Sequence, residues 1–195
     1  MKSHIGPALR LVLLATVALG LIYPLVMTGL AQLIFPSQAN GSLIVRHGRV
    51  IGSRLIGQRF TSARFFQGRP SATTPPYNGA SSAATNYGPT NPALIKEVKT
   101  NLAGVLKANP GVTASQVPPG LVESSDSGQD PDISPASALL QVPRVARANH
   151  LSTATVRHLV ESRIRGRFLG IFGNRYVNVL ELNLAVQSLA HGHGG

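Results

Sequence analysis

The stretch that most constrains this chain is Leu11–Phe35, which runs for 25 residues without a charged side chain. As a helix rising roughly 1.5 Å per residue it would be about 37 Å long, against about 30 Å for the apolar core of a bilayer. It is long enough to cross a membrane with some tilt. The sequence therefore predicts a transmembrane helix over residues 11–35, between a short cytoplasmic segment, residues 1–10, and a folded domain, residues 36–195.

A cleaved signal peptide is the alternative interpretation of the same stretch. Lys2 and Arg10 form a basic leading segment, and Ser37-Gln38-Ala39 resembles a cleavage site. The apolar part of a signal peptide usually holds about 7–15 residues, so the length of this stretch favours a retained anchor. In either case we expect the domain that follows to be extracytoplasmic. The positive-inside rule does not select this orientation, but large trailing domains translocate largely regardless of charge.

Small or helix-perturbing residues recur at every fourth position within the span, at Thr16, Gly20, Pro24 and Thr28. At that spacing they share one face of an α-helix, and small side chains let a neighbouring helix approach closely. We expect this stripe to be a partner-helix interface, and Pro24 to kink the helix by removing a backbone donor. The alternative is that Gly and Pro are simply more frequent in membrane helices.

The charge of the chain is strongly unbalanced, at +11 from 18 basic and 7 acidic residues. A nucleic-acid partner is not predicted, because the arginines are spread thinly and a membrane anchor removes the domain from nucleic acid. Membrane lipid with anionic headgroups, or an acidic partner, suits this charge better. The chain has no cysteine, which excludes disulfides, zinc-thiolate sites and a cysteine nucleophile.

The remaining residues predict one mixed domain of helices and short strands, and so an α+β fold class. Asn91-Pro92, Ser134-Pro135 and Ser152 are helix-start signals. Helices are expected from these points to Ala108, to about Asn149 with a kink or break at Pro143, and through Ile164, with a last helix over 180–189. Strands are expected as a hairpin over 43–51 and as short segments at 121–122 and 176–179.

An uncharged polar stretch, residues 70–95, interrupts these elements and is expected to be a long loop. Tyrosines among small polar residues are typical of adaptable contact surfaces. We therefore expect a partner-contact loop that includes Tyr77, Asn78, Tyr87 and Asn91. A flexible linker that divides the domain in two is the alternative.

Acidic residues gather at Asp126, Asp130 and Asp132, close to Glu123. The spacing departs from the calcium-binding loop pattern, so no metal site is predicted. A solvated turn before a helix is one interpretation, and a cation-attracting cluster is the other. Familiar catalytic motifs, including the P-loop, G-x-S-x-G and H-E-x-x-H, do not occur, and no catalytic residue is predicted.

Seven strings along the chain occur in the order typical of one family. They are ANGSL, GSRLIGQRF, RFFQGRPSAT, YN, GPTNPAL, SGQDPDISPASALLQVPRVARA and VNVLELNLAV. Together with the uncharged N-terminal span, they resemble the C subunit of the Kdp-type potassium-transporting ATPase over essentially the whole chain. The family usually reads SGLDPHISP, whereas this chain has Gln129 in place of Leu and Asp132 in place of His. It also has Gly173-Asn174-Arg175-Tyr176 where the family tends to have a Glu-Pro-Arg segment.

The resemblance implies an accessory subunit without catalytic residues or cofactors of its own. It implies a complex that uses ATP, magnesium and potassium, with three partners: a P-type pump subunit, a potassium-channel-like subunit and a small single-span subunit. The C subunit would lie in the bacterial inner membrane and aid assembly, potassium access or ATP affinity. An outer domain would not meet cytoplasmic ATP, so the last role conflicts with the expected topology. A membrane-anchored nucleotide-binding module and a stand-alone binding module are the alternative hypotheses.

Overall fold

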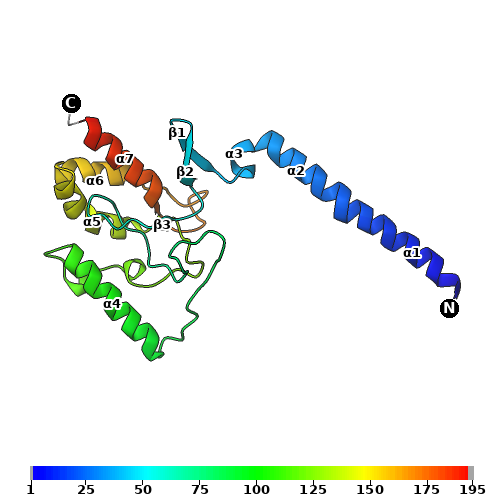
Figure 1. Cartoon of the computed structure of the whole chain (residues 1–195), viewed down its shortest axis with the longest axis horizontal. Coiled ribbons are helices and arrows are strands. Elements are labelled where there is room, and N and C mark those ends of the chain that lie inside the picture. Colours follow the sequence, from blue (N-terminus) through cyan, green and yellow to red (C-terminus); the bar gives the residue numbers. More distant parts are fainter. Residues whose placement is uncertain (1, 193–195) are drawn as a thin grey trace. The chain divides into compact units, whose positions relative to one another are not determined.

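The structure, a computed structural model, describes residues 2–192 and divides at Ile51/Gly52 into two units (Figure 1). The first unit is dominated by one long helix, composed of α1 (Lys2–Val17), a π-helical turn η1 (Ala18–Ile22) and α2 (Tyr23–Ile34). Its 31 residues from His4 to Ile34 are long and apolar enough to cross a membrane, and the window that meets this test has no buried residue. The apolar span predicted from the sequence is therefore a continuous helix.

The π-helical turn directly precedes Pro24, which explains how the helix continues through a proline. The Tyr23 N–H donates to the Ala18 carbonyl, five residues back. A proline in a regular α-helix clashes with the carbonyl four residues earlier, here that of Gly20, and the widened turn changes that spacing. The expected disturbance at Pro24 thus takes the form of a wider turn.

After α2 come a short helix, α3 (Pro36–Ala39), and a hairpin of β1 (Leu43–Arg46) and β2 (Arg49–Ser53). The two loop residues, His47 and Gly48, have φ angles of 49° and 74°. Positive φ at both central positions is what a tight two-residue hairpin of type I′ requires. The predicted hairpin is confirmed.

The core of the second unit lies among α5 (Pro135–Ala148), α6 (Thr153–Ser162) and α7 (Val179–Gly192). Both predicted caps are present, because the hydroxyls of Ser134 and Ser152 accept from backbone N–H groups three residues on, at 3.1 and 3.0 Å. Pro143 is exposed and does not break α5. The side chains with no exposed surface are Phe66, Ala138, Val142, Val145, Val156, Val160, Val177, Leu182 and Val186.

A two-stranded antiparallel sheet closes this core, with β3 (Asp132–Ile133) paired to β4 (Val177–Asn178). The prediction of a strand at 121–122 is wrong. This part of the chain forms two 3-10 turns, η2 (Ala114–Gln116) and η3 (Pro119–Leu121). Two consecutive prolines fix φ near −65° before Gly120, and the next N–H groups bond to carbonyls three residues back. The apolar side chains of Leu121 and Val122 are nevertheless buried.

Helix α4 (Pro92–Ala108) lies at the edge of the second unit (Figure 1). It packs against η3. Its predicted cap is present, since Asn91 Oδ1 accepts from the Ala93 N–H at 2.9 Å. None of its 17 residues is buried. The second unit is therefore a helix-rich α+β fold in which one amphipathic helix is only partly covered.

Candidate functional site

The irregular residues 63–83, which we call the clamped segment, are held in place by side chains of the core helices. The N–H of Phe66 donates to Asn183 Oδ1 at 2.7 Å, and Asn183 Nδ2 donates back to the Phe66 carbonyl at 2.9 Å. Gln141 makes the same two-way pair with the Gln67 backbone, at 2.8 and 3.0 Å. Both amides are almost fully buried. Each therefore satisfies backbone groups that a neighbouring strand would otherwise pair.

Arg144 extends this clamp toward the start of the segment. Its guanidinium donates to the carbonyls of Ala63 and Phe65 at 2.8 and 3.0 Å, to Gln141 Oε1 at 2.6 Å and to Asn109 Oδ1 at 3.1 Å. The residue is 8% exposed, and burial lowers the pKa of its guanidinium to about 10. Its hydrogen bonds to four neutral oxygens identify it as a structural cation.

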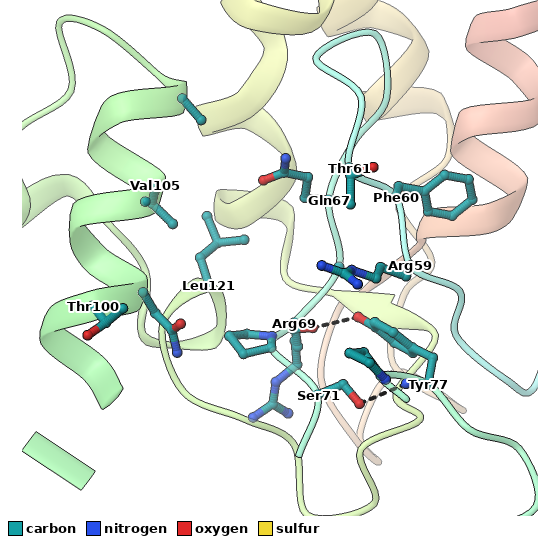
Figure 2. Close-up of a pocket in the computed structure, with 16 residues that line it drawn as sticks. Arg59, Phe60, Thr61, Gln67, Arg69, Ser71, Tyr77, Thr100, Val105 and Leu121 are labelled. Atoms are coloured by element: carbon teal, nitrogen blue, oxygen red, sulfur yellow. Dashed lines mark hydrogen bonds between the residues drawn. The ribbon is translucent and has the colours of Figure 1, made fainter. Parts of the chain in front are cut away.

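Tyr77 fixes the second half of the clamped segment (Figure 2). Its hydroxyl donates to the Arg69 carbonyl, and its backbone N–H donates to Ser71 Oγ at 2.9 Å. A Cβ added at Gly57 or at Gly68 would lie 2.5 Å from atoms of the tyrosine side chain. Gly57 of GSRLIGQRF and Gly68 of RFFQGRPSAT are thus explained by the close approach of the Tyr77 side chain.

Burial of the Tyr77 phenol raises its pKa to about 12, and the nearby charge of Asp130 acts in the same direction. The phenol is therefore neutral at physiological pH and acts as a hydrogen-bond donor. Its geometry favours a structural role over proton transfer, since its one acceptor is a backbone carbonyl.

The clamped segment is also joined to the acidic loop, residues 123–132. Ser71 Oγ donates to the Gly128 carbonyl at 2.6 Å, and Gln129 Nε2 donates to the Asn78 carbonyl at 2.9 Å. The Ala83 N–H reaches the Ser127 carbonyl at 3.1 Å. Residues 52–192 belong to one compact unit, so the alternative of a linker that divides the domain is wrong.

Only some residues of the expected partner-contact loop form hydrogen bonds within the chain. Tyr77 and Asn78 belong to the clamped segment, whereas Asn91 caps α4 and the Tyr87 side chain is 43% exposed. The structure shows no side-chain hydrogen bond among these four described residues, so it does not join them into one surface. Their contact with a partner stays a prediction.

The three aspartates have different surroundings. Asp130 forms an ion pair with Arg69 at 3.1 Å and accepts from the Asp132 N–H at 3.0 Å. Asp132 accepts from Asn178 Nδ2 at 3.0 Å, and burial raises the pKa of its carboxyl. Asp126 is exposed and lines a shallow pocket of about 460 Å³ together with Asp130. Within residues 2–192, no group of three or more His, Asp or Glu side chains is placed to hold a metal ion.

A groove of about 520 Å³, which sequence reasoning missed, lies between α4 and the clamped segment (Figure 2). Arg59, Arg69 and Tyr77 line one side, and Thr100 and Asn101 line the other. Its walls come from positions 59 to 121, which explains why no local pattern predicted it. Guanidinium, hydroxyl and amide groups line the groove, and those of Arg69, Tyr77, Thr100 and Asn101 also bond within the chain.

The stripe in the long helix is interrupted by the π-helical turn. A Cβ at Gly20 would contact the Thr16 methyl at 4.0 Å, so these two residues share a face. The extra residue in the turn shifts Pro24 and Thr28 relative to the uniform α-helical spacing that the prediction assumed. Docking of a partner helix on this face stays a prediction, with Thr16 and Gly20 as its best-aligned pair.

Comparison with known proteins identifies the family. The family model described as KdpC, K+-transporting ATPase, c chain, matches residues 5–188. The chain belongs to this family. It is 50% identical to the potassium-transporting ATPase KdpC subunit of Methylobacterium nodulans, over 97% of this chain and 99% of that protein. Subunits of the same name from Caldanaerobacter subterraneus and Sorangium cellulosum are 50% and 52% identical, over 95% of this chain and 95% and 98% of theirs.

The resemblance drawn from the seven strings is therefore confirmed, and the two departures in the acidic loop can be placed. Gln129 donates to the clamped segment, and Asp132 accepts from Asn178 of β4. Both residues join segments distant in sequence. Their contacts here are structural.

Proposed function

We propose that the chain is a non-catalytic accessory subunit of an ATP-driven potassium uptake complex. The observation that carries the proposal is the exposed apolar helix His4–Ile34 in a chain of the KdpC family. An apolar surface of this length is stable only against lipid or other membrane helices. The unit from Gly52 onward would then lie outside the cytoplasm, attached to the inner membrane by this helix.

The polar residues support an assisting rather than a chemical role. Asp130, Asp132 and Arg144 each bond to other parts of the same chain. In this proposal ATP, magnesium and the transported potassium are handled by the pump and channel-like subunits. The small single-span subunit and surrounding lipid are the further partners in the membrane.

Assembly is tested at the Thr16/Gly20 face. Gly20→Leu fills the space beside Thr16 and should weaken co-purification with the partner subunits in mild detergent. Leu19→Ile keeps the apolar character of a neighbouring exposed position and is the matched control. Equal recovery of the partners with both variants would remove this face from the interface.

Cation attraction by the acidic loop is tested at Asp126 rather than at all three aspartates. Asp126 is exposed, whereas Asp130 is paired with Arg69, so Asp130→Asn also removes a structural contact. Focusing predicts that Asp126→Asn weakens the apparent potassium affinity of the assembled ATPase, most clearly at low ionic strength. An unchanged affinity at low salt would leave the loop with its structural role alone.

Topology separates this proposal from a nucleotide-binding module. Protease added to spheroplasts should cleave the unit from Gly52 onward, and protease added to inverted vesicles should not. The opposite pattern would place the groove of Figure 2 in the cytoplasm, where its arginines Arg59 and Arg69 could meet a nucleotide phosphate. ATP titration of the full chain would then decide between the two functions.

A further inference from the structure

A narrow loop between α6 and β4, residues 165–176, has the form of a small hairpin, and we call it the apolar finger. The Arg165 N–H donates to the Tyr176 carbonyl at 2.8 Å, and the Tyr176 N–H donates back at 3.2 Å. Nearer the tip, Phe168 and Phe172 exchange a second pair of backbone bonds, both at 2.9 Å. Two bonded rungs give the loop a defined shape.

The base of the finger is attached to the core. The Arg165 guanidinium lies 6.0 Å from the centroid of the Tyr176 ring and forms an ion pair with Glu181 of α7. Glu181 also pairs with Arg54 at 2.9 Å. The ion pair with Glu181 therefore fixes the base of the finger to α7.

The tip exposes four large apolar side chains within five residues. Phe168, Leu169, Ile171 and Phe172 are 72%, 73%, 73% and 63% exposed. Single exposed apolar residues are ordinary, but a contiguous group usually marks an interaction site. In water, each of these side chains forgoes the free energy that burial would provide.

The apex is also conformationally unfavourable for the residue it holds. Leu169 and Gly170 are the central residues of the turn, with φ angles of 51° and 76°. Positive φ at such positions normally selects Asn, Asp or Gly. A leucine in the left-handed region is uncommon, and such exceptions gather at functional positions. Here the exception places a large, exposed apolar side chain in the turn.

The charged residues that flank the tip in the sequence are basic. Arg163, Arg167 and Arg175 flank it and are exposed. No acidic residue occurs in the sequence between Glu161 and Glu181. An apolar tip within a basic rim complements a bilayer surface, where acyl chains lie beneath anionic headgroups.

We propose that the apolar finger inserts its tip into the interface of a bilayer that contains anionic lipid. A lipid surface is favoured over a protein groove because the side chains of the tip are exposed and the charged residues that flank it are all basic. The membrane-spanning helix of the same chain would keep the finger at high effective concentration near the bilayer, so a weak insertion suffices. This proposal is independent of the accessory role and of the partner subunits assigned above.

The absence of tryptophan from the sequence gives a direct test. Phe172→Trp places a single indole at the tip of the full chain, reconstituted in bilayers of phosphatidylcholine with phosphatidylglycerol. Insertion predicts a blue-shifted emission that is quenched by lipids brominated on their acyl chains. Tyr87→Trp, at an exposed position far from the finger in sequence, is the matched control and should not be quenched.

A second substitution separates insertion from a structural role. In the Phe172→Trp chain, Leu169→Asn suits the left-handed turn better but removes the apolar apex. We expect the melting temperature to be unchanged or higher and most of the lipid quenching to be lost. Leu55→Asn, at a leucine that is 62% exposed outside the finger, should change neither.

The basic rim is tested in the same way. Arg167→Gln should lower the inserted fraction by about five-fold in anionic bilayers, and high salt should act in the same direction. The proposal is overturned if brominated lipid quenches the indole of the Phe172→Trp chain no more than that of the Tyr87→Trp chain. It is also overturned if assembly with the partner subunits protects the indole at the tip from acrylamide while brominated lipid leaves it unquenched, because the tip would then contact a subunit.

Discussion

The clamped segment and the apolar finger are both irregular, and their surroundings are opposite. The clamped segment is rich in small polar residues, yet its backbone is paired with buried amides such as Asn183 and Gln141. The finger has its own backbone rungs, yet it leaves Phe168 and Phe172 exposed. Composition alone suggests the reverse assignment, with the polar stretch outside and the apolar one inside.

The difference teaches that the partners of the backbone groups decide whether an irregular segment belongs to the core. A backbone without regular structure can be buried only if side chains satisfy its donors and acceptors. The clamped segment meets this condition through residues of α5 and α7. The finger meets it internally, which leaves its side chains available for an external surface.

The largest effect is expected at Arg144. Arg144→Leu leaves the Ala63 and Phe65 carbonyls without their donor and should lower the free energy of unfolding by about 3 kcal/mol. Arg147→Leu, on the exposed side of the same helix, is the control and should change it little. Chemical unfolding of the full chain in detergent measures both. Equal effects would mean that the clamp does not stabilise the segment.

The next effect is expected where the clamped segment meets the acidic loop. Gly128 has a φ of 67°, and a Cβ there would lie 2.6 Å from the Thr73 methyl and 3.0 Å from the Ala83 carbonyl. Gly128→Ala should therefore cost about 2 kcal/mol from strain and overlap together. Gly111 has a φ of 91° but open space around it, so Gly111→Ala isolates the backbone contribution. A similar loss at both sites would show that the junction is loose.

A smaller effect, with a defined pH dependence, is expected at Tyr77. Tyr77→Phe removes the hydrogen bond to the Arg69 carbonyl and should cost about 1 kcal/mol. Because the folded-state pKa of the phenol is raised from 10.0 to about 12, its contribution is complete below pH 10 and is lost as the pH rises toward 12. Unfolding measured from neutral pH to pH 11 should show the two proteins converging. A gap that widens with pH would contradict this assignment.

The smallest effect is expected in the finger. Phe172→Ser removes an exposed side chain, and in detergent it should change the free energy of unfolding by less than about 0.5 kcal/mol. The same substitution in the buried part, Phe66→Ser, should be severely destabilising because Phe66 has no exposed surface. A large decrease in the free energy of unfolding from Phe172→Ser would show that the finger packs against the fold. The contrast between the finger and the clamped segment would then be wrong.

Local signals in the sequence predicted most of the helices and the first hairpin. Asn91, Ser134 and Ser152 begin helices as expected, and His47-Gly48 forms the turn. Each of these is decided by neighbouring residues. The strand expected near Leu121 failed because local prolines outweighed the apolar pair.

The clamp and the groove could not be predicted, because their parts are distant in the chain. Gln67 meets Gln141 across 74 residues, and no local pattern reports that pairing. In the finger, Gly170 and Gly173 lie among apolar residues. The alternation of glycine with Phe, Leu and Ile indicates a turn but gives no sign that the apolar side chains stay exposed.

The pairing of Phe66 with Asn183 also sets an order of events during synthesis. The two residues are 117 positions apart, so the backbone of Phe66 has no native partner until α7 has left the ribosome. At roughly 5–20 residues per second, that interval is on the order of 10 s. During that interval the clamped segment is an open chain, and it is rich in small polar residues that tolerate water. Its composition thus suits its time before folding as well as its place in the folded protein.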